Sequence, residues 1–157
     1  MMPTTDKLSR QQLLRDLGVA NTTYRAAVAR HHGDELAALH ELLSAIVDDA
    51  AHGWSARKLA ALRLVQLERD RYERLRWQRA AHRIELDELA ARGVVEAAVV
   101  SANPDCMGCA AINNVLLEPG NESSLERLPP RICLHLEQGH SCCIAFAPRI
   151  VAAAVAA

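Results

Sequence analysis

The sequence predicts an α+β fold: a helical region with one long helix, followed by a small β-rich module held together by a metal ion. Three observations predict it. Apolar residues recur at intervals of three and four through residues 1–93, as in helices that pack against each other. A β-branched run follows Gly93, and all five cysteines lie after position 105. We therefore expect a helical region over residues 1–93 and a cysteine-rich, zinc-ribbon-like module over residues 94–157.

Capping residues divide the first region into four expected helices. A short polar side chain can accept backbone hydrogen bonds at a helix start, and a glycine can end the helix. The expected helices run from Asp6 to Gly18, from Asn21 or Thr22 to Gly33, from Asp34 to Gly53, and from Ser55 to Arg92. No Gly or Pro interrupts residues 56–92, so we expect one long helix there. Its apolar residues occupy more than one face, which favours self-association.

Short β-strands are expected in the second region, separated by Pro and Gly loop markers. The candidate strands are Val94–Ser101, Val115–Leu117, Cys133–Leu136 and Cys143–Phe146.

The charge balance narrows the function classes. The chain has 18 Lys and Arg against 19 Asp and Glu, and this excludes a strongly basic nucleic-acid-binding protein. No apolar run reaches eighteen residues, and the first residues lack the pattern of a signal peptide. We therefore expect no membrane partner and a cytoplasmic location, where clustered thiols stay reduced.

The cysteines form two groups with the spacing of a metal site. Cys106 and Cys109 form a C-x-x-C knuckle, in which a tight turn brings both sulfurs to one ion. Cys133 and one of the adjacent Cys142 and Cys143 complete a tetrahedral zinc set, because adjacent strand residues face apart. The alternate ligands are His135 and His140. Two other interpretations are small buried thiols and a redox C-x-x-C, but the βαβ context of the latter is missing.

The order of these motifs resembles a known phage module. The residues that carry the resemblance are Val99-Val100-Ser101, Asp105-Cys106-x-x-Cys109, Ile112-x-Asn114, Leu128-Pro129-Pro130, Cys133 and Cys143-x-x-Phe146. They are similar to the cysteine module of phage head morphogenesis proteins, the minor head proteins of the Mu F-like and SPP1-like kind. That module ends in C-R-C and an aromatic residue, where this chain has Ser141-Cys142-Cys143.

The resemblance implies both a ligand set and a role. Ser141 stands at the first cysteine of the family's C-R-C pair and Cys142 at its Arg, so the resemblance implies Cys143 as the fourth ligand and Cys142 as a spare. It also implies a non-enzymatic assembly protein with structural Zn²⁺ and other protein subunits as partners. The location would be the virion if the protein is phage-encoded.

An Arg-rich stretch supplies the alternative function. Residues 55–83 carry nine cations against three anions, and a subset recurs on one helix face. This pattern allows a zinc-containing nucleic-acid-binding protein, although a salt-bridged helix surface is the commoner explanation. The candidate phosphate contacts are Arg69, Arg76, Arg79 and Arg83. The nucleotide-binding, hydrolase and zinc-deaminase motifs that we sought do not occur, which favours a non-enzymatic protein. A third interpretation is an enzyme with a reactive thiol at Cys142 or Cys143.

Overall fold

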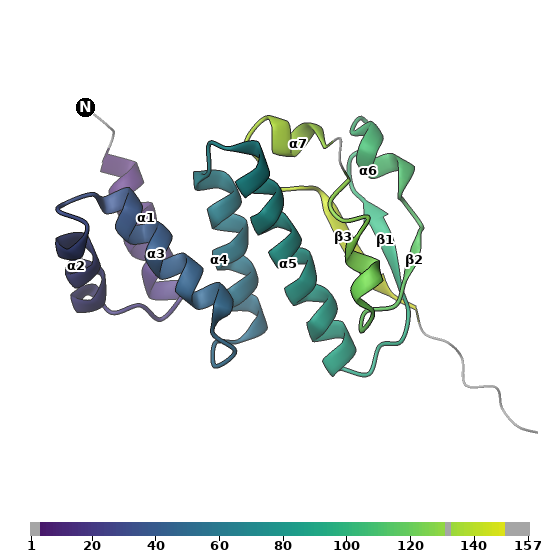
Figure 1. Cartoon of the computed structure of the whole chain (residues 1–157), viewed down its shortest axis with the longest axis horizontal. Helices are drawn as coiled ribbons and strands as arrows, with labels where there is room; N and C mark the ends of the chain where they lie inside the picture. The colour runs from purple at the N-terminus through teal and green to yellow at the C-terminus, as the bar shows by residue number, and fades with distance from the viewer. Residues whose placement is uncertain (1–3, 131–132, 150–157) are drawn as a thin grey trace, which may run out of the picture.

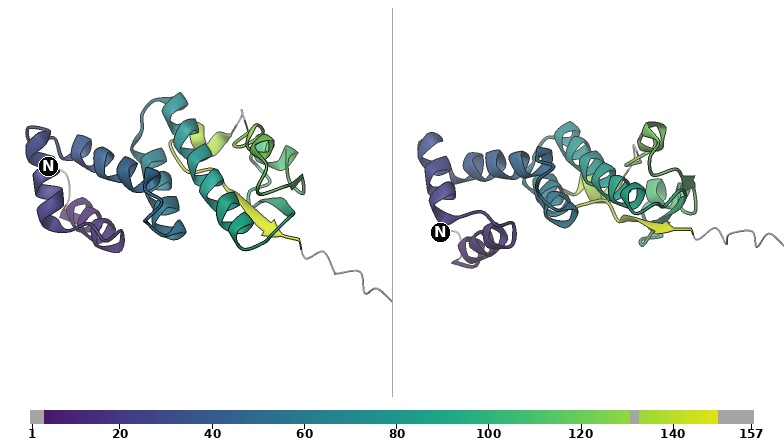
Figure 2. Two further views of the ribbon diagram at one scale, coloured as in Figure 1. Left: turned by 60° about the horizontal axis from the view of Figure 1, so that its bottom comes forward. Right: turned by 90° about the horizontal axis from the view of Figure 1, so that it is seen from below.

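The computed structural model describes residues 4–130 and 133–149, and it confirms the α+β fold. These residues form seven α-helices, one 3₁₀ helix and a three-stranded antiparallel sheet. The molecule is elongated, with the N-terminal helices at one end, a helix pair in the middle and the sheet at the other end (Figure 1). Two turned views show the same order of layers (Figure 2).

Three helices form the N-terminal end. They are α1 (Thr4–Asp16), α2 (Asn21–Arg30) and α3 (Glu35–Asp48). Asp34 caps α3 as the sequence predicts, because its carboxylate accepts hydrogen bonds from the backbone N–H groups of Leu36 and Ala37 at 3.0 Å each. None of the helices in residues 4–130 and 133–149 is both long and apolar enough to cross a membrane.

The single helix expected over residues 55–92 is wrong. The structure has two helices, α4 (Trp54–Leu67) and α5 (Arg71–Ala91), which pack against each other. The break comes from Asp70, whose carboxylate accepts hydrogen bonds from the N–H groups of Tyr72 and Glu73 at 2.9 and 3.0 Å. Asp70 is thus an N-cap inside a run that lacks Gly and Pro, and folding back lets the two helices bury their apolar faces.

The sheet consists of β1 (Ala97–Ser101), β2 (Leu116–Leu117) and β3 (Ile144–Pro148), in the order β2-β1-β3. The strands predicted around these three segments are confirmed. Cys133–Leu136 was predicted as a fourth strand, and this is wrong: Cys133 caps the short helix α7 (Leu134–Glu137). A segment of only four residues has too little periodicity to separate strand from helix. Helix α6 (Met107–Ala111) and the 3₁₀ helix η1 (Glu122–Leu125) lie in the connections.

Helix α5 joins the two regions of the chain. One side of α5 packs against α4, and α7, η1 and β3 also contact it. The Phe146 ring of β3 meets the His82 ring of α5 edge-on, with 5.4 Å between the ring centroids. The buried residues on both sides of Gly93 belong to one continuous hydrophobic core. The cysteine module is therefore built directly onto the helical region.

Candidate metal centre

Three buried thiols gather at one point of the module. The Sγ atoms of Cys106, Cys109 and Cys133 all lie within 4.8 Å of one another. All three side chains are at most 2% exposed. Such a group of soft sulfur donors could hold a metal ion.

Short helices position these thiols. Cys106 is the N-cap of α6 and Cys109 lies inside it, so one helical turn brings both sulfurs to the same side. The turn before α6 is fixed by Asn103, whose side-chain oxygen accepts the Asp105 N–H at 2.9 Å. Cys133 is the N-cap of α7, and the nearby backbone N–H groups of Leu136 and His135 help to lower the pKa of its thiol.

Cys142 brings a fourth thiol to the group. Its Sγ lies 3.6 Å from that of Cys109, and its side chain is buried. Its backbone N–H donates to Gln78 Oε1 of α5 at 2.8 Å, a contact that fixes the chain just before β3. Three segments of the module and α5 therefore meet at this point.

Cys143, which the family resemblance implied as the fourth ligand, lies elsewhere. Its Sγ is 3.9 Å from the Ser101 hydroxyl, and its side chain is only half-buried. Successive residues of an extended chain point to opposite sides, so Cys142 and Cys143 cannot both face Cys109. In the described structure Cys142 therefore faces Cys109, whereas Cys143 faces Ser101.

The two candidate histidines are outside the thiol group. His135 Nε2 lies 3.2 Å from the side-chain nitrogen of Asn103, and its Nδ1 is buried without a hydrogen-bond partner in the described structure. His140 is exposed, and its backbone N–H donates to the His135 carbonyl at 2.7 Å. Sulfur atoms alone form the group of possible ligands found among the described residues.

Two of the sulfur–sulfur distances, both measured from Cys109, are close to those of a tetrahedral thiolate site. A Zn–S bond of about 2.3 Å in tetrahedral geometry separates the sulfurs by about 3.8 Å. The observed separation is 3.8 Å from Cys109 to Cys133 and 3.6 Å from Cys109 to Cys142.

The cysteines of the cluster differ in how readily their thiols lose a proton. Hydrogen bonding from the Cys142 thiol, more than any other contact, lowers the pKa of Cys133 to about 5. Donating that hydrogen bond raises the pKa of Cys142, and burial raises the pKa of Cys109. One thiolate at Cys133 is therefore stabilised by its neighbours, whereas several buried thiolates need a cation beside them.

Sequence reasoning missed two buried polar residues behind the cluster. Gln78 and His82 are 1% and 2% exposed, and they lie four residues apart on α5. The Gln78 side-chain nitrogen is 3.3 Å from His82 Nε2, while its oxygen accepts the Cys142 N–H. Their i, i+4 spacing within an otherwise apolar face was the available signal. Burial lowers the pKa of His82 to about 3, so the ring is neutral.

Three of the four arginines proposed as phosphate contacts interact with other residues of the chain. Arg83 makes two hydrogen bonds of 2.8 Å to the Glu122 carboxylate, and Arg79 Nε donates to the Leu128 carbonyl at 3.1 Å. Arg76 pairs with Glu73 at 3.2 Å and stacks over the Trp77 ring. Arg69 is exposed in the connection between α4 and α5. Two of the four candidate phosphate contacts thus attach the module to α5.

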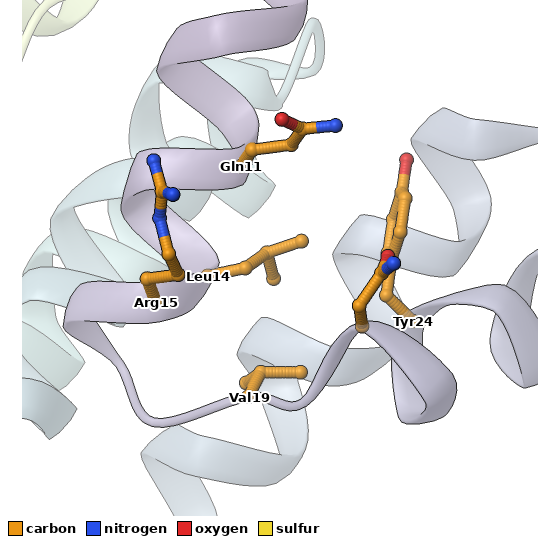
Figure 3. Close-up of a pocket in the computed structure, with 6 residues that line it drawn as sticks. Gln11, Leu14, Arg15, Val19 and Tyr24 are labelled. Carbon is orange, nitrogen blue, oxygen red and sulfur yellow. The ribbon is translucent and has the colours of Figure 1, made fainter.

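A separate pocket lies at the opposite end of the molecule, between α1 and α2 (Figure 3). Its lining residues are Gln11, Leu14, Arg15, Val19, Asn21 and Tyr24. This lining contains no thiol, imidazole or carboxylate, so it offers neither a metal-ligand set nor an acid–base pair.

Comparison of the chain with protein-family models, with curated proteins and with solved structures found no match.

Proposed function

We propose that this chain is a non-enzymatic protein whose module is held together by one structural Zn²⁺ bound to Cys106, Cys109, Cys133 and Cys142. The observation that carries this proposal is the buried cluster of Cys106, Cys109 and Cys133, whose Sγ atoms all lie within 4.8 Å of one another. The Sγ atom of Cys142 lies 3.6 Å from that of Cys109 and supplies a fourth thiol.

The donor set favours zinc over other ions. Thiolate sulfur is a soft ligand, and four such ligands in a tetrahedron select Zn²⁺ or an iron–sulfur centre rather than Mg²⁺ or Ca²⁺. Four protein ligands fill the coordination sphere and leave no open position for water or substrate, which supports a structural rather than a catalytic ion. Free thiols of this kind persist in a reducing compartment, so we propose a cytoplasmic location.

The ion would link segments that have few other ties. It would join the N-terminal turns of α6 and α7 to the residues just before β3, and the Cys142 N–H to Gln78 contact would extend this link to α5. A small module with a three-stranded sheet has a limited apolar core, and metal binding contributes folding free energy to such modules.

The role of the stabilised fold is protein assembly. The resemblance of residues 99–146 to the cysteine module of phage head morphogenesis proteins supports other protein subunits, including further copies of this chain, as partners. Leu59 of α4 and Tyr72 of α5 remain 41% and 78% exposed, so the α4–α5 pair keeps apolar side chains available for self-association.

Metal analysis combined with thiol counting tests the zinc site in the purified full chain. We expect one zinc per chain and four thiols that resist alkylation, with Cys143 alone modified. A metal-free protein with five reactive thiols would contradict the site. Sedimentation velocity over a range of concentrations tests self-association separately. A chain that stays monomeric, alongside Leu59→Glu and Tyr72→Glu variants that sediment identically, would contradict that part.

A further inference from the structure

The pocket between α1 and α2 has an apolar floor and an aromatic wall. Leu14 of α1 is 4% exposed, and Val19, in the connection between the two helices, packs against the same core. The Tyr24 ring of α2 stands opposite Leu14, so these two side chains face each other across the space (Figure 3). The pocket has a volume of about 200 Å³, and a neighbouring hollow of about 150 Å³ shares Gln11, Leu14 and Tyr24 with it. The combined space is that of a small-ligand site.

The rim of this pocket carries hydrogen-bond donors and one positive charge. Gln11 and Asn21 are exposed, and neither side chain makes a hydrogen bond within the described part of the chain. Arg15 donates to the neutral side chain of Gln12 at 2.9 Å, and it forms no ion pair with a carboxylate of the described residues. Arg15 is the one charged residue of the lining, so the pocket is electropositive.

The phenol of Tyr24 adds a neutral donor to the same space. Burial, and after it the nearby Glu35 carboxylate, raises the pKa of Tyr24, so the hydroxyl keeps its proton at neutral pH. Glu35 lines the neighbouring hollow, where Arg10 pairs with it at 3.3 Å and offsets its charge. An apolar space surrounded by donors and a cation suits a ligand with an apolar body and an anionic head.

We infer that this pocket binds a small aromatic carboxylate, with its ring between Leu14 and Tyr24 and its carboxylate on Arg15. A tyrosine ring favours an aromatic partner, and the planar guanidinium matches a carboxylate. A single cation suits a monoanion. Within the described chain, α1 belongs to none of the closely packed pairs of elements, so the ligand would fill a gap and tie α1 to α2. The site is separate from the metal centre.

Titration of the purified full chain with benzoate, followed by two-dimensional NMR of the backbone amides, tests this site. We expect saturable shifts of signals from residues 11–24 and a dissociation constant of about 1 mM or lower. Benzamide has nearly the same shape without the charge. It should bind about tenfold more weakly, because hydrogen bonds between charged groups are stronger than those to a neutral amide.

Three variants assign the contacts. Arg15→Gln removes the charge at an exposed position and should weaken benzoate binding about tenfold, and Tyr24→Leu about fivefold. Arg25→Gln, which removes an exposed cation of α2 outside the lining, is the matched control and should bind as the wild type does. Thermal unfolding verifies that each variant is folded.

Three results would overturn the site. The first is an absence of shifts at about 10 mM benzoate, well above the expected dissociation constant. The second is shifts confined to residues outside α1, α2 and their connection. The third is an Arg15→Gln variant that binds benzoate as tightly as the wild type, or a wild type that binds benzamide and benzoate equally.

Discussion

The backbone N–H of Cys142 donates a hydrogen bond to Gln78 Oε1 at 2.8 Å, and this contact joins the thiol cluster to the longest helix of the fold. Both residues are buried, so water cannot replace the bond if it is broken. The cluster and the helical region are therefore energetically linked.

Exchanging the two adjacent cysteines for serine separates the ligand from the spare. Cys142→Ser is expected to weaken zinc binding by about 100-fold or more, because a direct ligand matters more than the outer partners, whose loss costs about 10–100-fold. Cys143→Ser is the matched control and should leave zinc binding unchanged. Competition with a zinc chelator measures both affinities. The reverse order of effects would return the ligand role to Cys143.

Gln78→Leu is expected to destabilise the fold by about 1–3 kcal/mol, because the buried Cys142 N–H loses its acceptor. Urea unfolding measures the loss, and zinc competition should show weaker binding as well. The matched control is Gln66→Leu on the exposed surface of α4, which should change stability by no more than about 0.5 kcal/mol. An equal loss of stability in the two variants would show that the hydrogen bond from Cys142 to Gln78 does not stabilise the fold.

His82 gives the stability a defined pH dependence. Its pKa is about 3 in the fold against 6.5 for an exposed imidazole, so between these values the unfolded chain binds the extra proton. Stability is full above pH 6.5 and falls as the pH drops toward 3, by about 1.4 kcal/mol per pH unit. His82→Gln keeps an acceptor for Gln78 and removes the titration.

The free energy of unfolding of the wild type and of the His82→Gln variant should therefore be compared between pH 7 and 5. Acid release of zinc affects wild type and variant alike, so the difference between their slopes isolates His82. If the free energy of unfolding had the same slope against pH in both proteins, His82 would bind a proton in the fold without destabilising it.

The break between α4 and α5 depends on the carboxylate of Asp70. Asp70→Ala should destabilise the protein by about 1 kcal/mol, since the N–H groups of Tyr72 and Glu73 lose their acceptor. Asp70→Asn keeps a side-chain oxygen and should stay close to the wild type in thermal unfolding. If alanine and asparagine gave the same melting temperature, the cap would not be what stabilises the start of α5.

The nucleic-acid alternative leads to a further measurement. Because Arg79 and Arg83 bind the module, and Arg76 pairs with Glu73, we expect no retardation of generic duplex DNA at low salt. A shift that disappears steeply with added salt would contradict this expectation. In that case Arg69→Ala combined with Arg76→Ala should remove the shift, whereas Arg10→Ala, far along the chain, should not.

The sequence alone determined the fold class, most of the strands, the cap at Asp34 and the gathering of cysteines into one site. These follow from local patterns, because capping, alternation and the C-x-x-C turn act over a few residues. Asp70 was also a local signal, but the lack of Gly and Pro around it masked the break.

Only the tertiary structure decided which cysteine faces the cluster, because adjacent residues differ by the face they present and not by their chemistry. The same holds for Gln78, His82 and Arg83. Their partners, which are Cys142, Phe146 and Glu122 respectively, lie far away in the sequence. The burial of Gln78 and His82 and the pairing of Arg83 arise when the module packs on α5, and the sequence does not encode which distant residue meets them.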